Sequence, residues 1–285
     1  MKRQIPNILT CCNLICGCIA AFFAFYSVSF AGARAAADTH GFAMLVNCYK
    51  MAFFFILLGA VFDFFDGFVA RLLKVSGPIG VQLDSLADVV TFGVAPGAMI
   101  FSLFSNVYYP GAMQGHAWFA FIPYLAFLLP AFAAYRLAKF NVDERQHDGF
   151  LGLPTPACAI FWAALIYSSP KYLLSQHFNA IYLIIFMLVF CYLMVSEIPM
   201  FSLKFKGFDW NLPGNKMRYV FLFMAVIALT VAAVWGALEN LLVQYMSRAL
   251  VGIIVLYIFI SIGNMYVTMK KDEMDYYEEY QNDNV

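Results

Sequence analysis

Eight long apolar stretches constrain this chain more than any other feature of its sequence. A helix needs roughly 20 apolar residues to cross a ~30 Å hydrocarbon core. The stretches lie near residues 11–33, 50–73, 82–106, 117–140, 154–170, 178–196, 217–238 and 244–268. They are continuously apolar, whereas the strands of a membrane barrel alternate. With 63% hydrophobic and 12% charged residues, the chain is predicted to be an all-α polytopic membrane bundle of about eight transmembrane helices.

The basic residues predict the orientation of this bundle, because Lys and Arg gather in cytoplasmic loops. With both chain ends in the cytoplasm, four of the 17 Lys and Arg fall outside and the other thirteen inside. The four are Arg34, Lys50, Lys171 and Arg248. This asymmetry predicts an even number of spans, with N-in and C-in ends. The first stretch also resembles a signal peptide, but "IPNILTCCN" is more polar than a secretory apolar region, which favours a span.

Four aspartates interrupt the apolar sequence "VFDFFDGFVARLLKVSGPIGVQLDSLADVVTFG" between residues 61 and 93. They are Asp63, Asp66, Asp84 and Asp88. An ionised side chain at the centre of a membrane helix costs roughly 2.5–3.5 kcal/mol on insertion scales. Four such side chains facing lipid would be prohibitive, so they are expected to share a polar cavity or a counter-charge.

The spacing of the aspartates brings them together. Asp63 and Asp66 lie at i and i+3, and Asp84 and Asp88 at i and i+4, so each pair occupies one helical face. The Gly- and Pro-containing turn "KVSGPIG" lets the second helix return antiparallel to the first. We therefore expect one cluster of four carboxylates just inside the cytoplasmic boundary.

Such a cluster needs cations, and Arg71 supplies one positive charge at most. Hard divalent ions prefer oxygen ligands, and Mg²⁺ commonly combines carboxylates with substrate phosphates. Two metal ions sharing carboxylates can clamp a diphosphate during in-line displacement, and Gly67 and Gly80 leave the backbone open to a bulky headgroup. The alternative is that the aspartates are helix caps or paired surface charges, with Asp84 as an N-cap.

Written out, the stretch is Asp63-x2-Asp66-Gly67-x2-Ala70-Arg71-x8-Gly80-x3-Asp84-x3-Asp88. It resembles the signature of the CDP-alcohol phosphotransferases, with no departure at any signature position. The resemblance implies that an alcohol attacks a CDP-activated lipid and releases CMP. It further implies metal binding, with two Mg²⁺ or Mn²⁺ ions, by Asp63, Asp66, Asp84 and Asp88, a general-base role for Asp88, and a CDP pocket formed by Gly67, Ala70, Arg71 and Gly80.

Four further segments resemble the membrane-embedded bacterial phosphatidylserine synthases of that family: "IPNILTCCNLICG", "AYRLAKFN", "GLPTPACA" and "VSEIPMFSLKFK". The resemblance implies that Asn7, Thr10 and Asn13 line the nucleotide site. It also implies CDP-diacylglycerol and L-serine as substrates, a homodimer, no nucleic-acid partner, and an active site facing the cytosol in the cell membrane.

The serine pocket needs a cation for the carboxylate of serine. Arg136 and Lys139 follow an apolar helix on the cytosolic side and would supply it, although basic residues there are also ordinary topology anchors. Lys139 stands where an arginine is common in the subfamily, so bidentate contact is lost at that position. The Pro154–Pro156 pair predicts a helix start, and Thr155 is interpreted as a cap in preference to a ligand.

Together these patterns divide the chain into a catalytic core at 1–206, two additional helices at 207–270 and an acidic cytoplasmic tail at 271–285. The nearest alternatives are other family members with glycerol phosphate, inositol phosphate or a second phospholipid as acceptor. Membrane prenyl transfer also uses Asp-rich helices, but it does not require the glycine and arginine positions. A divalent-cation transporter is the third alternative, although transport sites tend to lie near the bilayer midplane in internal repeats.

Overall fold

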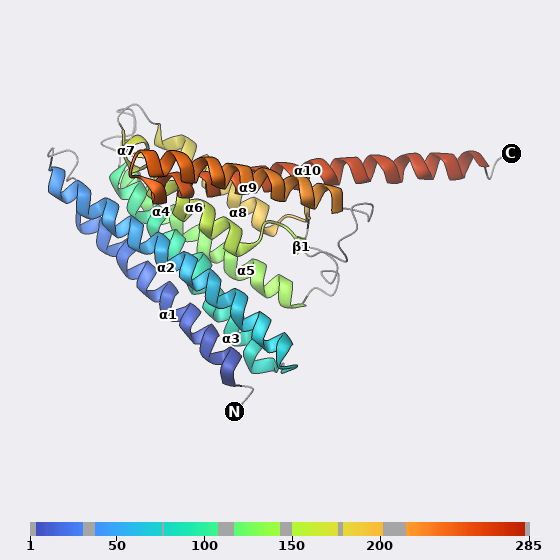
Figure 1. Ribbon diagram of the computed structural model, residues 1–285, viewed down its shortest axis with the longest axis horizontal. Helices are drawn as coiled ribbons and strands as arrows, with labels where there is room; N and C mark the ends of the chain where they lie inside the picture. Colours follow the sequence, from blue (N-terminus) through green and yellow to red (C-terminus); the bar gives the residue numbers. More distant parts are fainter. Residues whose placement is uncertain are drawn as a thin grey trace.

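The computed structural model describes residues 4–30, 38–75, 77–107, 117–142, 150–175, 179–201 and 215–282, which are almost entirely helical (Figure 1). The main helices are α1 (Gln4–Tyr26), α2 (Thr39–Leu72), α3 (Pro78–Asp88), α4 (Ala95–Asn106), α5 (Leu128–Val142), α6 (Thr155–Ser168), α8 (Ala180–Val195), α9 (Asn215–Leu238) and α10 (Leu242–Asn282). Shorter elements are η1 (Ser27–Phe30), η2 (Val89–Val94), η4 (Ala117–Phe127) and α7 (Pro170–Leu173). The predicted helical bundle is confirmed.

Six of the described helical segments are long and apolar enough to cross a membrane. They are Gln4–Phe30, Thr39–Leu72, Pro78–Asn106, Ala120–Val142, Asn215–Leu238 and Leu242–Tyr266. The two further apolar helices, α6 and α8, have 14 and 16 residues, which corresponds to about 21 and 24 Å of helix. The protein is therefore a multi-pass membrane protein, whose described residues include six helical segments long and apolar enough to span the membrane and two shorter apolar helices.

Several helix boundaries differ from the hydropathy prediction. α1 begins at Gln4 rather than at residue 11, and α2 begins at Thr39 rather than at residue 50. Both extensions contain polar residues that a hydropathy window excludes. The start of α2 is stabilised by Asp38, whose side chain accepts a hydrogen bond from the His40 N–H at 3.0 Å. At the other end of the chain, α10 continues through the sequence predicted as a tail as far as Asn282.

A two-stranded antiparallel ladder was not predicted. β1 (Phe150–Leu151) pairs with β2 (Pro199–Met200) and joins the approach to α6 to the end of α8. Gly152 follows β1 with φ of +74°, and a Cβ there would lie 2.5 Å from the Met194 carbonyl oxygen. Only glycine fits this position. The turn fixes where α6 begins, and the predicted helix start at the two prolines is confirmed.

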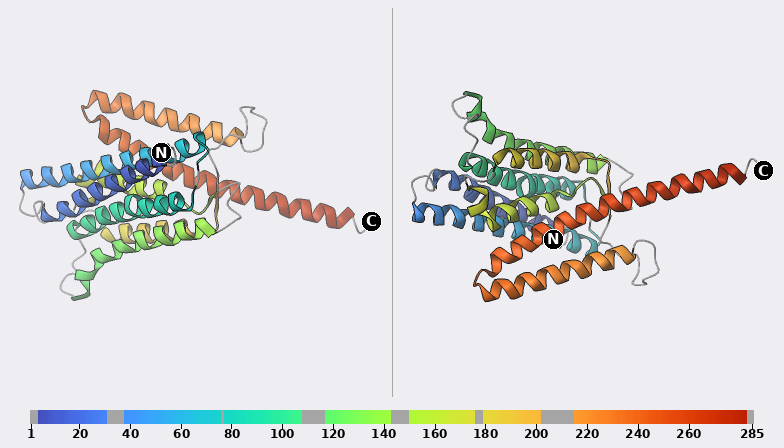
Figure 2. Two further views of the ribbon diagram at one scale, coloured as in Figure 1. Left: turned by 90° about the horizontal axis from the view of Figure 1, so that it is seen from below. Right: turned by 90° about the horizontal axis from the view of Figure 1, so that it is seen from above.

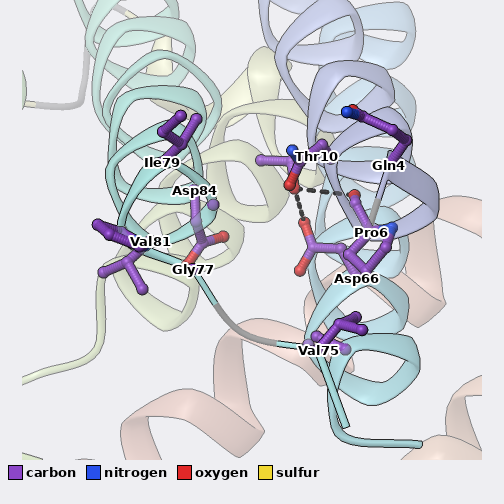
Figure 3. Close-up of a pocket in the computed structure, with 14 residues that line it drawn as sticks. Gln4, Pro6, Thr10, Asp66, Val75, Gly77, Ile79, Val81 and Asp84 are labelled. Atoms are coloured by element: carbon purple, nitrogen blue, oxygen red, sulfur yellow. Dashed lines mark hydrogen bonds between the residues drawn. The ribbon is translucent and has the colours of Figure 1, made fainter. Parts of the chain in front are cut away.

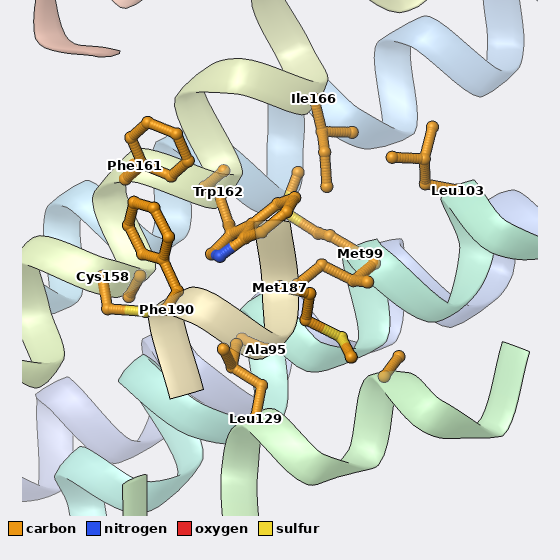
Figure 4. Packing of buried hydrophobic residues seen from close by; sticks show 14 of the residues in the cluster. Ala95, Met99, Leu103, Leu129, Cys158, Phe161, Trp162, Ile166, Met187 and Phe190 are labelled. Carbon is orange, nitrogen blue, oxygen red and sulfur yellow. The ribbon is translucent and has the colours of Figure 1, made fainter. Parts of the chain in front are cut away.

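The bundle is held together by a core centred on α6. Trp162 and Phe161 on α6 pack against Phe190 on α8, with Met99 on α4 in the same cluster (Figure 4). The rings of Phe161 and Phe190 stack at 4.3 Å between centroids. Because α6 is buried on nearly every side, this shorter helix is surrounded by protein more than by lipid.

The last two helices pack as a hairpin. α10 contacts both α9 and α6, and its C-terminal half projects from the end of the bundle at which α1 begins (Figure 2). The division into a core, two extra helices and a tail stays a prediction. Of the residues that predicted the orientation, Lys2, Arg3, Arg34, Arg145, Lys204 and Lys206 lie outside the described residues.

Candidate metal centre

The four signature aspartates lie on the last three turns of α2 and along α3, close to the end of the bundle where three helix ends meet. The start of α1, the end of α2 and the start of α3 come together at one end of the bundle (Figure 1). α1 packs against both α2 and α3, and the turn after α2 includes Lys74 with φ of 52°. This turn reverses the chain, so the acidic faces of α2 and α3 approach each other.

Three of the carboxylates converge. Asp63, Asp66 and Asp84 each place one oxygen so that all three atoms lie within 4.8 Å of one another. One oxygen of Asp84 is buried without a hydrogen-bond partner among the described residues. Hard oxygen donors at this separation, one of them unpartnered, fit a divalent cation. The interpretation of Asp84 as a helix cap is wrong, because α3 begins at Pro78 with Gly77 as its N-cap.

Helix α1 supplies hydrogen bonds to the two carboxylates that are most buried. Thr10 Oγ1 lies 2.7 Å from Asp66 Oδ2 and 3.1 Å from the Pro6 carbonyl oxygen. Since the hydroxyl has a single hydrogen, the shorter contact to the carboxylate is the stronger one. Asn13 Nδ2 donates to Asp88 Oδ1 at 3.0 Å. Thr10 and Asn13 of α1 therefore hold one aspartate from each acidic helix.

A cavity of about 480 Å³ opens beside the carboxylates (Figure 3). Its lining comes from α1, the end of α2 and the start of α3: Gln4, Pro6, Asn7, Thr10, Asp66, Gly67, Ala70, Val75, Gly77, Pro78, Ile79, Gly80, Val81 and Asp84. Cavities of this volume accommodate cofactor- or nucleotide-sized ligands. Figure 3 shows Asp84 on α3 across the cavity from Thr10 and Asp66.

Two glycines shape the cavity wall. A Cβ on Gly80 would lie 3.3 Å from Asn7 Oδ1, and one on Gly67 would lie 3.4 Å from an Arg71 guanidinium nitrogen. Gly80 thus lets Asn7 approach α3, and Gly67 gives the Arg71 guanidinium room along α2. Of the residues predicted to bind CDP, the structure brings Asn7, Thr10, Gly67, Ala70 and Gly80 to the cavity.

Arg71 and Asn13 do not line the cavity themselves. Arg71 is exposed next to Gly67, and Asn13 is fully buried behind the carboxylates. Asp63 and Asp88 likewise lie outside the lining, although Asp63 shares the three-oxygen cluster.

The two basic residues predicted for the acceptor have different surroundings. Arg136 is buried on α5, donates to Thr155 Oγ1 at 3.5 Å, and has an Nε without a partner among the described residues. Lys139 is partly exposed and its Nζ lies 3.5 Å from Glu197 Oε1. The interpretation of Thr155 as a cap is wrong, because Pro154 is the N-cap of α6 and Thr155 contacts Arg136 instead.

Sequence reasoning missed the residues that hold α1 in place. Thr91 donates to the Asn13 carbonyl oxygen at 3.0 Å, and Gly17 and Gly59 both face Thr91. These contacts join helices that are far apart in the sequence, and no sequence motif predicts them.

Comparison with known proteins places the chain in a family. The model of the CDP-alcohol phosphatidyltransferase family matches residues 3–269. A protein from Helicobacter pylori named CDP-diacylglycerol–serine O-phosphatidyltransferase is 30% identical over 181 residues, covering 63% of this chain and 71% of the relative. Proteins of the same name from Bacillus subtilis (29% over 196 residues, 69% of this chain and 89% of the relative) and Saccharomyces cerevisiae (35% over 151 residues, 46% and 50%) are also similar. The chain belongs to the CDP-alcohol phosphatidyltransferase family.

Proposed function

We propose that this protein is a phosphatidylserine synthase, which transfers the phosphatidyl group of CDP-diacylglycerol to L-serine and releases CMP. The observation that carries the proposal is the convergence of the signature carboxylates beside a cavity lined by Gly67, Ala70 and Gly80. The acceptor is supported by the names of the relatives, which are serine phosphatidyltransferases in bacteria and yeast. Family membership favours a transferase over the transporter and prenyl-transfer alternatives.

In the proposed reaction, Asp88 takes the proton of the serine hydroxyl. The serine oxygen then forms a bond to the β-phosphorus of CDP-diacylglycerol, and the bond from that phosphorus to the bridging oxygen breaks, so CMP leaves with the bridging oxygen. Asp88 Oδ1 is occupied by the Asn13 amide, which leaves Oδ2 for the proton. Two Mg²⁺ or Mn²⁺ ions held by Asp63, Asp66, Asp84 and Asp88 would supply charge neutralisation at the diphosphate.

We propose that the CDP moiety occupies the cavity, with Asn7, Thr10, Gly67, Ala70 and Gly80 along its wall and Arg71 at its edge. The exposed guanidinium of Arg71 suits an anionic diphosphate. Asn13 was predicted to contact the nucleotide directly, and that prediction remains untested. Its buried amide supports a role behind the carboxylates.

Arg136 is proposed to bind the carboxylate of serine. It is buried, its hydrogen bond to Thr155 is long, and its Nε has no partner among the described residues. Lys139 is already paired with Glu197, so we expect it to contribute less. Arg136→Gln should raise the KM for serine about 10- to 100-fold, since hydrogen bonds between charged groups are worth about 1.5–3 kcal/mol.

The measurement is initial CMP release at varied serine concentration, with Lys216→Gln on the exposed start of α9 as a charge-matched control. The KM for CDP-diacylglycerol should stay within about twofold in both variants. An unchanged KM for serine in Arg136→Gln would show that Arg136 does not bind the acceptor.

An acceptor panel tests the function itself. Purified protein receives CDP-diacylglycerol, Mg²⁺ or Mn²⁺, and one of serine, glycerol 3-phosphate, inositol phosphate or phosphatidylglycerol. CMP release with serine alone supports the proposal. Release with another alcohol would keep the family reaction and overturn the choice of acceptor.

We further propose the N-in, C-in orientation, with the cavity open to the cytosol in the cell membrane. It is supported by the start of α1 and the polar end of α10 lying at the same end of the bundle as the cavity (Figure 2). The homodimer stays a prediction from the family resemblance, because lipid would cover the exposed apolar helix faces as well as a second copy would. Labelling of a cysteine introduced at the exposed Lys74, in the turn at the cavity end, by a membrane-impermeant thiol reagent tests the orientation.

A further inference from the structure

The segment that follows Asp88 is not an ordinary α-helix. Between α3 and α4, residues Val89–Val94 form a π turn, in which the Ala95 N–H bonds to the Val90 carbonyl oxygen, five residues back. A π turn inserts one extra residue into the helix and is frequent at functional sites. Thr91, which lies within this turn, is completely buried.

The hydroxyl of Thr91 makes an unusual hydrogen bond for a membrane helix. A Ser or Thr within a membrane helix commonly donates to the carbonyl four residues earlier, and Ser85 and Ser105 in the same membrane span do so. Thr91 Oγ1 instead donates to the carbonyl oxygen of Asn13 on α1, at 3.0 Å. The hydroxyl therefore connects two helices.

Two glycines make this connection possible. A Cβ on Gly17 of α1 would lie 2.8 Å from Thr91 Cα, and a Cβ on Gly59 of α2 would lie 2.6 Å from Thr91 Cγ2 and 3.0 Å from Asn13 Oδ1. Any larger residue at Gly17 would push the π turn away from α1, and any larger residue at Gly59 would push it away from α2. The slot occupied by Thr91 is thus built by small residues on both neighbouring helices.

Asn13 is held at two points. Its backbone carbonyl accepts from Thr91, and its side-chain amide donates to Asp88 Oδ1 at 3.0 Å. Thr91 and Asp88 are three residues apart and therefore face α1 on the same side. Asn13 Oδ1 has no partner among the described residues, so within them Asp88 is the polar partner of this side chain.

We infer that Thr91 is a positioning residue for the transfer reaction. Its hydrogen bond to the Asn13 carbonyl oxygen fixes the position of Asn13 on α1, so that the Asn13 amide can donate to Asp88. The inference rests on the proposed role of Asp88 as the base. Losing the hydroxyl would free Asn13 to shift, and Asp88 would lose its fixed rotamer. A misplacement of about 1 Å at a reacting group can cost on the order of 100-fold in rate, and outer partners of metal-site ligands typically contribute about 10- to 100-fold.

The test compares Thr91→Val, which keeps the shape and removes the hydroxyl, with Thr91→Ser, which keeps the hydroxyl and removes a methyl group. CMP release with serine is measured at varied CDP-diacylglycerol. We expect Thr91→Val to lower kcat about 10-fold or more, with the KM for CDP-diacylglycerol within about twofold, and Thr91→Ser to retain kcat within about threefold. Ser102→Ala is the matched control, because it removes a buried interhelical hydroxyl about 16 Å from Thr91 along the same span.

A double-mutant cycle separates positioning from a general packing effect. Because Thr91 acts through Asn13, Thr91→Val added to Asn13→Ala should lower kcat no further than Asn13→Ala alone. Additive losses in kcat, an equal loss in Thr91→Ser and Thr91→Val, or an unchanged kcat in Thr91→Val would each overturn the inference. Thr91→Ala replaces Thr91→Val if the latter has no cooperative thermal transition in detergent. Absence of CMP release by the folded wild-type protein would contradict the proposed function instead.

Discussion

Two polar clusters lie within the first three membrane spans of the bundle, and their chemistry differs. The carboxylate cluster consists of Asp63, Asp66, Asp84 and Asp88. The hydroxyl cluster, at the opposite end, consists of Ser27, Tyr49 and Ser102, which are all buried. Ser27 and Ser102 lie 2.5 Å apart, Tyr49 lies 3.2 Å from Ser102, and Ser27 also donates to the Ala24 carbonyl oxygen.

The hydroxyl cluster is neutral and its members satisfy one another. The carboxylate cluster is acidic, forms no ion pair among the described residues, and leaves one oxygen of Asp84 without a partner. Buried polar groups that are satisfied internally stabilise a fold, whereas buried charges that are left unpaired need a cation or substrate. This difference supports a structural role for the hydroxyl cluster and a ligand-binding role for the carboxylate cluster.

Metal removal should give the largest effect, because it acts on the carboxylate cluster alone. We expect EDTA to abolish CMP release and added Mg²⁺ or Mn²⁺ to restore it. Metal at about 100 times its Kd should also raise the free energy of unfolding by about 2.7 kcal/mol. Asp84→Asn should lose this thermal stabilisation in detergent. A metal-induced rise in melting temperature that persists in Asp84→Asn would show that the ion binds at another site.

Asp88→Asn should lower kcat about 100- to 10,000-fold, the usual contribution of a general base. The variant keeps the size of the side chain, so its melting temperature should stay close to that of the wild type. Asp38→Asn is the matched control, because Asn caps a helix as well as Asp does and Asp38 lies at the start of α2. Normal turnover in Asp88→Asn would exclude its role as base.

Gly59→Ala tests how tightly α2 packs against the carboxylate end. The new Cβ would meet Thr91 and Asn13, and overpacking of this kind costs about 1–3 kcal/mol. We expect a lower melting temperature together with lower turnover. Gly252→Ala on α10 has nothing within 4 Å of the added methyl group and should be neutral or slightly stabilising. Equal behaviour of the two variants would show that the helix contact at Gly59 is loose.

Ser102→Ala should give the smallest effect on turnover. The substitution removes the hydrogen bond between Tyr49 and Ser102 and the one between Ser27 and Ser102. A buried unsatisfied group costs about 1–3 kcal/mol. The melting temperature should fall while kcat stays within about twofold. A large loss of kcat would contradict the separation of the two clusters.

The acidic cluster could be predicted because it depends on residues that lie close together in the sequence. The spacing of Asp63 to Asp66 and of Asp84 to Asp88, with a turn between, fixes two helical faces. The partners on α1 could not be predicted from geometry, since the rotation of α1 against α2 depends on Gly17 and Gly59. Hydropathy also misplaced the starts of α1 and α2, because polar residues such as Thr10 are satisfied by partners from other helices.

The most direct test follows the product itself. The purified protein is reconstituted into liposomes that contain CDP-diacylglycerol, supplied with isotope-labelled serine and Mg²⁺ or Mn²⁺, and the lipids and nucleotides are quantified by mass spectrometry. We expect labelled phosphatidylserine and CMP in equal amounts from the wild-type protein, and neither above background from Asp88→Asn. Absence of labelled lipid from the folded wild-type protein, or equal amounts from Asp88→Asn, would contradict the assignment of the carboxylate cluster as a serine phosphatidyltransferase site.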